Sequence, residues 1–126
     1  MAEGDRPEAT IRIADEAVAT VAAVAATGVE GVAGLSAGLV GDLSSALGRR
    51  GGPRGVRVEV GEREAAVDLY LVVRYGVRIP EVAHRVQQAV KKAVEEMTDL
   101  KVVEVNIHVQ GVVFPPVQKP EREGSP

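Results

Sequence analysis

Cysteine and tryptophan are absent from the chain, and its 126 residues include only two tyrosines and one phenylalanine. The lack of cysteine excludes disulfide bonds, thiolate metal sites and a cysteine nucleophile. So few aromatic side chains cannot form the stacking platform that binds single-stranded nucleic acid. No segment approaches the ~18 consecutive apolar residues of a membrane-spanning helix, and the acidic N-terminal residues do not resemble a secretory signal. We therefore expect a protein that stays inside the cell and does not insert into the membrane.

Valine and alanine dominate instead, with 24 and 17 copies, and 45% of all residues are hydrophobic. This length and composition fit one domain with a substantial core. The 15 basic and 18 acidic side chains nearly balance and give a formal charge of −3. Residues 1–9 and the proline-rich residues 115–126 have too few apolar side chains to offset the entropy cost of ordering. We expect a single α+β domain over residues 10–114, with disordered ends and a flexible Gly- and Arg-rich loop at 41–55.

The spacing of apolar residues predicts two helices. The first is expected to begin with Asp15 as its cap and to end at Gly28. Its apolar stripe consists of Val18, Val21, Ala22, Ala25 and Val29. The second is expected to begin near Pro80, and its stripe consists of Val82, Val86, Val90, Val94 and Met97. Each helix therefore has one face to bury.

Alternation of apolar and polar residues predicts strands over 56–60, 67–73 and 103–109, and a short strand is expected from Val32 to Ser36. The tight turn after residue 60 makes the first two an antiparallel hairpin. In the last strand the valines and the isoleucine are expected on one face, namely Val103, Val105, Ile107 and Val109. The strand–helix–strand order from residue 64 to 113 predicts a crossover connection. The expected fold class is α+β: a two-layer sandwich with two main helices on one face of a three- to four-stranded mixed sheet.

The other face of this sheet would remain polar and open, which makes it the first candidate for a working surface. Its predicted partner-binding residues are Asp68, Tyr70, Arg74, Asn106 and His108. The edges of the sheet offer a second route to a partner, because an unpaired strand can add a neighbour's strand.

Residues suited to catalysis form no known pattern in this sequence. His84 and His108 are on different predicted elements, and neither has further ligands at the spacing of a metal site. The serines lack a GxSxG motif, and neither a Walker A nor a GxGxxG motif is present. We therefore expect no catalytic residues, no metal, no cofactor and no enzymatic activity. A small-ligand or metal site at one of the two histidines is an alternative hypothesis.

Two features could contact an anionic partner. Four arginines surround a Gly-Gly-Pro turn and could bind phosphate, an anionic lipid surface or an acidic protein: Arg49, Arg50, Arg54 and Arg57. The segment Gly28–Gly31 has the GxxG spacing of KH RNA-binding domains, but Glu30 occupies it and no cation does. The end of a helix and a turn explain the same residues. A KH-like RNA-binding domain is thus the alternative function, and nucleic acid is not the expected partner.

The second half of the domain carries the most specific pattern in the chain. The run from Tyr75 to Gln87 has the form Tyr-Gly-x-x-Ile-x-x-Val-Ala-x-x-Val-Gln, and residues 105–111 have the form Val-Asn-Ile-x-Val-x-Gly. Further matching segments are Glu30–Val32, Val56–Val60 and Val67–Val73. In these residues the chain resembles the alkaline-shock-protein family of bacterial envelope stress response proteins.

The resemblance implies a small cytoplasmic protein that an anchoring partner can hold at the periphery of the membrane, in support of the envelope under stress. No catalytic residues come with it. The segment 41–55 and the proline-rich tail depart from the family pattern, so the partner of a particular member is not transferred. We expect a non-enzymatic interaction or scaffold module that acts through a protein partner, or through self-association as a homo-oligomer.

Overall fold

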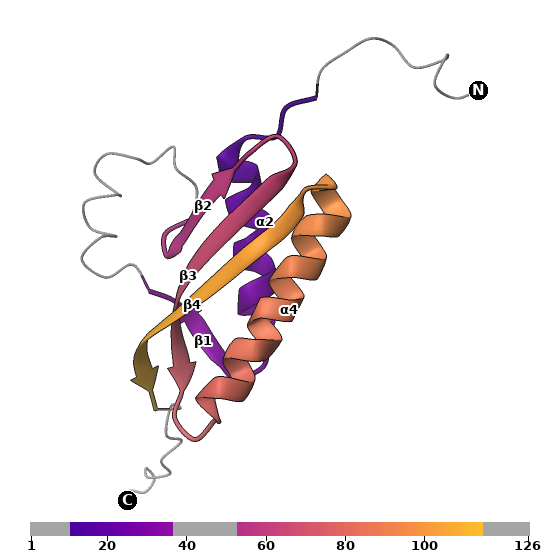
Figure 1. The fold of residues 1–126 in the computed structure, drawn as a ribbon. Coiled ribbons are helices and arrows are strands. Elements are labelled where there is room, and N and C mark those ends of the chain that lie inside the picture. Colours follow the sequence, from indigo (N-terminus) through magenta and orange to yellow (C-terminus); the bar gives the residue numbers. More distant parts are fainter. Residues whose placement is uncertain (1–10, 37–52, 115–126) are drawn as a thin grey trace, which may run out of the picture.

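A computed structural model describes residues 11–36 and 53–114 of the chain. Its elements, in chain order, are α2 (Asp15–Thr27), β1 (Val32–Leu35), β2 (Val56–Val60), β3 (Glu64–Arg74), α4 (Ile79–Thr98) and β4 (Lys101–Val113). Figure 1 shows both helices on one side of the sheet. The predicted fold class, with two helices on a mixed four-stranded sheet, is confirmed. Both predicted disordered ends and most of the predicted loop at 41–55 lie outside the described residues.

Strand β3 is the centre of the sheet and pairs with each of the other three strands. It is antiparallel to β2, as the hairpin predicted, and parallel to β4, as the crossover predicted. Strand β1 lies on the same edge as β2, because Ser36 N donates to Tyr70 O at 2.7 Å and Tyr70 N donates to Gly55 O at 2.9 Å. Together β1 and β2 therefore form one interrupted edge strand, which the chain leaves at Ser36 and re-enters at Gly55.

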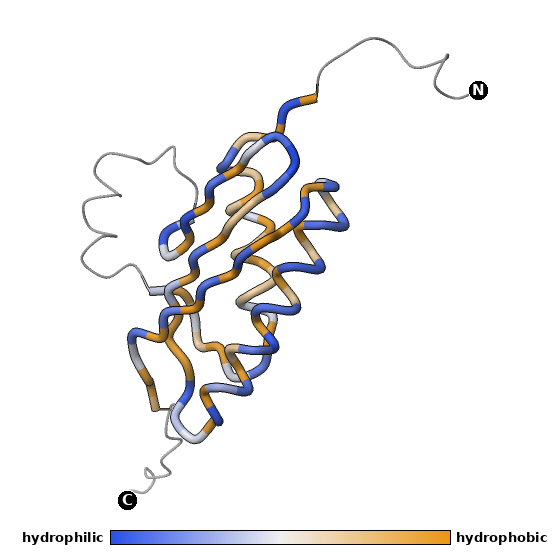
Figure 2. Tube along the Cα trace, viewed as in Figure 1, coloured by the Kyte–Doolittle hydropathy of each residue, from blue (hydrophilic) through white to orange (hydrophobic). Residues whose placement is uncertain are grey.

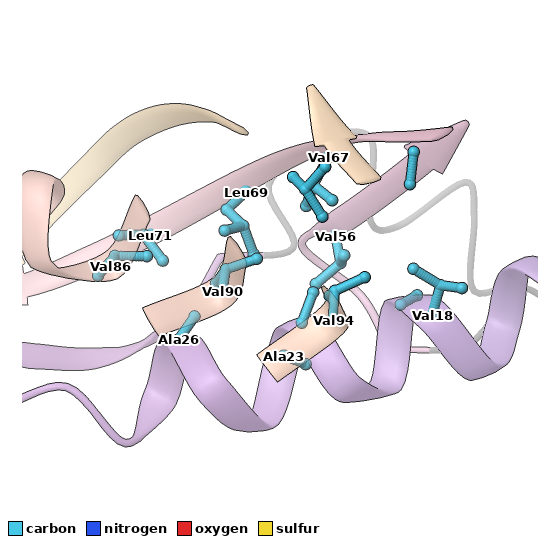
Figure 3. Close-up of a cluster of buried hydrophobic side chains, with 14 of the residues drawn as sticks. Val18, Ala23, Ala26, Val56, Val67, Leu69, Leu71, Val86, Val90 and Val94 are labelled. Carbon is cyan, nitrogen blue, oxygen red and sulfur yellow. The ribbon is translucent and has the colours of Figure 1, made fainter. Parts of the chain in front are cut away.

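The core lies between the sheet and the helices, and its buried side chains are all valine, alanine or leucine. The predicted inward positions of β3 and α4 are buried, with one exception at the end of α4. Figure 3 shows the valines of α4 and the inward side chains of β3 pointing toward one another. Each such side chain contributes about 1.5–3 kcal/mol on burial, which outweighs the modest helix propensity of the valines in α4.

Helix α2 buries a different face from the predicted one. Val18 and Ala22 are buried as expected, whereas Val21, Ala25 and Val29 are only partly buried. The remaining buried positions are alanines: Ala19, Ala23 and Ala26. Helix α2 packs against both α4 and the sheet. Its small inward side chains allow a close approach, because the separation of packed elements depends on the side chains at the contact.

The ends of the helices also differ from the prediction. Ala14 is the N-cap of α2, so Asp15 is the first helical residue, where its carboxylate still interacts favourably with the helix dipole. Met97 was predicted to be inward but is 71% exposed. Helix α4 ends one residue later, the chain turns at Asp99 with a φ of 66°, and Leu100 is buried in the core instead.

Strand β4 contains two bulges, which change the direction of its side chains. Two adjacent residues of β3 pair with Val102 and Glu104, so Val103 is an extra residue between them. Val102 is buried and Val103 is 50% exposed, so the prediction that Val103 faces the core is wrong. A second bulge makes Gln110 an extra residue. Alternation of residue types could not reveal the first bulge, because valine occupies both positions.

Side chains of α4 also bind backbone groups of β4 that face away from β3. Gln87 Nε2 donates to Val105 O at 3.0 Å, and Val102 N donates to Glu95 Oε2 at 2.9 Å. The two bulges in the pairing with β3 also distort β4. An edge that is bulged and partly bound by side chains is a poor template for adding a neighbour's strand. The open face is therefore a better candidate surface than this edge.

We expect Glu95→Gln to destabilise the α4–β4 contact in a pH-dependent way. The Lys91 ammonium, 2.9 Å away, and the Val102 N–H hold the pKa of the Glu95 carboxyl below its ordinary value of 4.5. A lowered folded-state pKa contributes stability that is complete above the unfolded pKa and is lost as the pH falls through the folded pKa. The variant should therefore melt below the parent at neutral pH, and the two melting temperatures should converge in acid.

The neighbouring carboxylate supplies the control for this measurement. Glu96 pairs only with Lys92, at 3.1 Å, and accepts no hydrogen bond from β4 among the described residues. Glu96→Gln should therefore change the melting temperature less than Glu95→Gln does. Equal losses in both variants would show that the contact with β4 has no stabilising effect.

Candidate interaction surface

The face of the sheet that carries no helix presents the polar side chains of the strands. Figure 2 shows hydrophilic and hydrophobic residues alternating along the strands. The parallel register of β3 and β4 places Asp68 opposite Asn106, and Tyr70 opposite His108. Four of the five predicted partner-binding residues thus lie side by side. We call these four the open-face cluster.

The carboxylate of Asp68 is the centre of the open-face cluster. Its Oδ1 atom accepts a hydrogen bond from Asn106 Nδ2 at 3.0 Å and lies 3.5 Å from His108 Nε2. The imidazole of His108 stacks on the ring of Tyr70, with centroids 4.6 Å apart and 13° between the planes. Asn106 also donates to Glu104 at 3.2 Å. These contacts orient the side chains before any partner binds, which lowers the entropy cost of binding.

Arg74, the fifth predicted residue, does not belong to this cluster. It is the exposed last residue of β3, where it pairs with Val113 of β4. With Tyr75 and Arg78 it lines a shallow hollow of about 460 Å³ at the end of the sheet. The structure therefore assigns Arg74 to a different part of the surface.

The predicted arginine loop is only partly described. Arg49 and Arg50 lie outside the described residues. Arg54 is exposed in the turn before β2. Arg57 is exposed within β2 itself, directly opposite Asp68 of β3. The guanidinium of Arg57 therefore adds a cation to the open face beside the cluster, which could be recognised only from the strand register.

The Gly28–Gly31 segment connects α2 to β1. Gly28 ends the helix, and Gly31 is buried with a φ of 100°. A Cβ atom at Gly31 would lie 2.8 Å from Cγ2 of Val82 in α4, so close packing requires glycine at this position. Glu30 is exposed and is the only charged residue of the segment. Packing accounts for Gly31 without a phosphate ligand.

His84 and His108 are exposed on different elements, α4 and β4. Across residues 11–36 and 53–114, no three histidine, aspartate or glutamate side chains are grouped so that they could hold a metal ion. Within the same ranges, no helix is both long enough and apolar enough to cross a bilayer.

None of the three aromatic residues is in the core: one lies in β3, and the other two directly follow β3 and β4. Tyr70 is half-buried in the open-face cluster. Tyr75 and Phe114 are largely exposed and stack on each other, with centroids 4.7 Å apart. This second pair was not predicted. The sequence contains one relevant signal, a Val-Val-Phe run that breaks the alternation at the end of the last strand.

Comparison with known proteins identifies relatives over much of the chain. YqhY and YloU of Bacillus subtilis (strain 168) are 39% identical over 61 residues and 43% identical over 70 residues. A stress response regulator gls24 homologue of Streptococcus pyogenes serotype M3 is 44% identical over 55 residues. These alignments cover 48%, 56% and 44% of this chain. The matched part spans only 45%, 58% and 31% of the three relatives' lengths.

A family model matches residues 3–114, a span that includes every residue that the structure describes. It represents the alkaline shock protein 23 family, whose function is cell envelope-related. The resemblance seen in the Tyr75–Gln87 and 105–111 runs is thereby confirmed. The chain belongs to the alkaline shock protein 23 family.

Proposed function

We propose that the protein is a non-enzymatic interaction module of the envelope stress response, which presents its open sheet face to a protein partner. The observation that carries the proposal is the preorganised open-face cluster, where the Asp68 carboxylate binds side chains from the neighbouring strand. No polar or charged residue is buried in the described part of the chain. Catalytic groups usually depend on burial to shift their reactivity, so this arrangement favours binding over catalysis.

The charges of the open face favour a partner with basic side chains. Near the cluster, the carboxylates of Glu59, Asp68 and Glu104 outnumber the guanidinium of Arg57. A second copy of the chain would bring the same excess of carboxylates, whereas lysine or arginine side chains would complement it. The envelope-related family, and the stress response regulator among the relatives, support a partner that is anchored in the cytoplasmic membrane.

Photo-crosslinking in the protein's own cells tests this proposal. A benzophenone amino acid in place of Val72, which lies on the open face beside the cluster, should form an adduct with one protein. The same probe in place of the exposed Gln88, on the outer side of α4, should not. Truncating a side chain at the centre of an interface often weakens binding about tenfold or more. Adding Tyr70→Ala and His108→Ala should therefore lower the adduct yield by about that factor.

The melting temperature of the doubly substituted protein checks that it remains folded, because neither side chain is part of the core. Equal adduct yields from the Val72 and Gln88 positions would contradict the proposal. So would a yield at Val72 that is unaffected by the two alanine substitutions.

A further inference from the structure

One end of the molecule gathers exposed apolar side chains that the proposed function does not use. Strands β3 and β4 end there and α4 begins there, at the lower end of the view in Figure 1. Tyr75 and Phe114 stack on each other and are 62% and 70% exposed. The adjacent Val112 and Val113 are also exposed, and Figure 2 shows this end of β4 in the hydrophobic colour. We call these four residues the sheet-end patch.

Basic side chains flank the sheet-end patch. Arg74, Arg78 and Arg85 line the 460 Å³ hollow together with Tyr75, which also belongs to the patch. The acidic residues of the hollow are Glu30 and Glu81. Three arginines against two glutamates leave a local formal charge of +1, whereas the whole chain has a charge of −3. The local charge is therefore opposite in sign to that of the protein.

The arginines of the hollow are only weakly held by protein groups. Glu81 lies 3.6 Å from both Arg78 and Arg85, and these side chains are more than half exposed. Exposed ion pairs of this length contribute little stability. Arg74 forms no ion pair with any other residue in the described ranges. All three guanidinium groups can therefore turn toward an anion outside the protein.

We propose that this end of the sheet docks on the surface of an anionic lipid bilayer. Tyr75 and Phe114 would enter the headgroup region, where aromatic rings are favoured. Arg74 and Arg78 would contact lipid phosphates, since basic side chains are attracted to an anionic leaflet. This contact is separate from the proposed protein partner, which binds the open-face cluster.

A second copy of the chain fits the sheet-end patch less well. Each partner in a stable protein–protein interface contributes about 800 Å² of surface, whereas the patch consists of only four side chains. Two copies joined through this end would also bring their arginines close together. An anionic bilayer complements both the apolar rings and the positive charge.

Vesicle flotation of the full-length protein tests the proposal. Binding is expected to vesicles rich in phosphatidylglycerol at low salt, and to fall sharply at high salt or with phosphatidylcholine alone. A basic side chain near an anionic surface strengthens binding about fivefold, so Arg74→Gln combined with Arg78→Gln should weaken it about 25-fold. Tyr75→Ser combined with Phe114→Ser should weaken it about tenfold by removing apolar contact with the interface.

Matched controls come from the opposite end of the molecule. Arg63→Gln, in the turn between β2 and β3, removes an exposed charge there. Met97→Ser, in the last turn of α4, removes an exposed apolar side chain. Both controls should bind vesicles as the parent does, and sedimentation without vesicles should show the same mass for every variant.

Five results would overturn the proposal. The first is the absence of binding to anionic vesicles at low salt, and the second is equal binding to neutral vesicles. The third is an equal loss of binding in the control variants. The fourth is displacement from vesicles by inorganic phosphate at low concentration, which would indicate a site for a free anion. The fifth is a change of oligomeric mass in the Tyr75 and Phe114 variant, which would identify a second copy as the occupant. Crosslinking at Val72 reports on the protein partner independently of all five.

Discussion

Leu69→Ala is expected to lower the free energy of unfolding by about 2–5 kcal/mol, the range for truncating a buried leucine. Leu69 is fully buried at the middle of β3. It pairs with Val56 of β2 on one side and with Ile107 of β4 on the other. Strands on both sides and helices above hold the surrounding atoms in place, so the cavity cannot close by local relaxation. Urea denaturation, followed by circular dichroism, measures the loss.

Leu35→Ala is the matched control for this measurement. The same isopropyl group is removed, but Leu35 is only partly buried, at the end of β1 on the edge of the sheet. Its neighbours can shift and water can enter, so Leu35→Ala should lower the free energy of unfolding by less than half as much as Leu69→Ala does. Similar losses at the two positions would mean that the centre of β3 is not the best-packed part of the core.

The elements predicted most accurately are those with apolar residues on one face only. In β3, the inward valines and leucines alternate with Asp68, Tyr70 and the half-buried Val72, and every inward position of the predicted strand is buried. In α4, valines four residues apart are separated by polar or charged residues and alanines, so only one orientation of the helix buries its apolar stripe. Helix α2 has no such contrast, because alanine and valine occur around most of its circumference. Its buried face depends on how closely α4 and the sheet approach.

The candidate site was predicted only in part, because it also depends on how the elements pair. Alternation places Asp68, Tyr70, Asn106 and His108 on one face, but only the register of β3 and β4 makes them neighbours. Bulges set this register, and they depend on backbone geometry that residue types do not determine. Arg57 lay in the predicted strand 56–60 but was grouped with the arginines of the preceding loop, because only the register of β2 and β3 places it opposite Asp68.

The two most specific sequence runs meet in the folded chain. The first run ends at Gln87, and the second begins at Val105, whose carbonyl oxygen accepts a hydrogen bond from Gln87 Nε2 at 3.0 Å. Earlier in the first run, Val82 and Val86 are buried in the core. Each run thus has a structural role in joining α4 to β4, and packing accounts for part of this recognisable sequence pattern.

Gly31→Ala is expected to lower the free energy of unfolding by about 2–5 kcal/mol, from backbone strain and overpacking together. Gly31 has a φ of 100°, which an L-residue with a side chain rarely adopts. Its new Cβ would lie 2.8 Å from Cγ2 of Val82, a stiff side chain that is buried in the core. Either Val82 or the segment between α2 and β1 must move. Urea denaturation measures the loss.

Gly76→Ala separates the two causes. Gly76 also has a φ of 100°, but a Cβ atom there would have no neighbour within 4 Å. Gly76→Ala should therefore lower the free energy of unfolding through backbone strain alone, by about 1–2 kcal/mol. If the two variants lose equal stability, the contact with Val82 has no role.

The Gly31→Ala variant also distinguishes the packing explanation of Gly31 from the RNA-binding alternative. A KH-like loop would use the Gly28–Gly31 backbone to contact phosphates, so RNA binding would be strong at low salt and would weaken steeply as salt is added. Gly31→Ala would then reduce RNA affinity. Since Glu30 is the exposed charge of this segment and Gly31 is buried against α4, we expect no salt-dependent RNA binding by the parent protein. The effect of the substitution should appear in stability alone, because the glycine is required by the contact between two elements of the core.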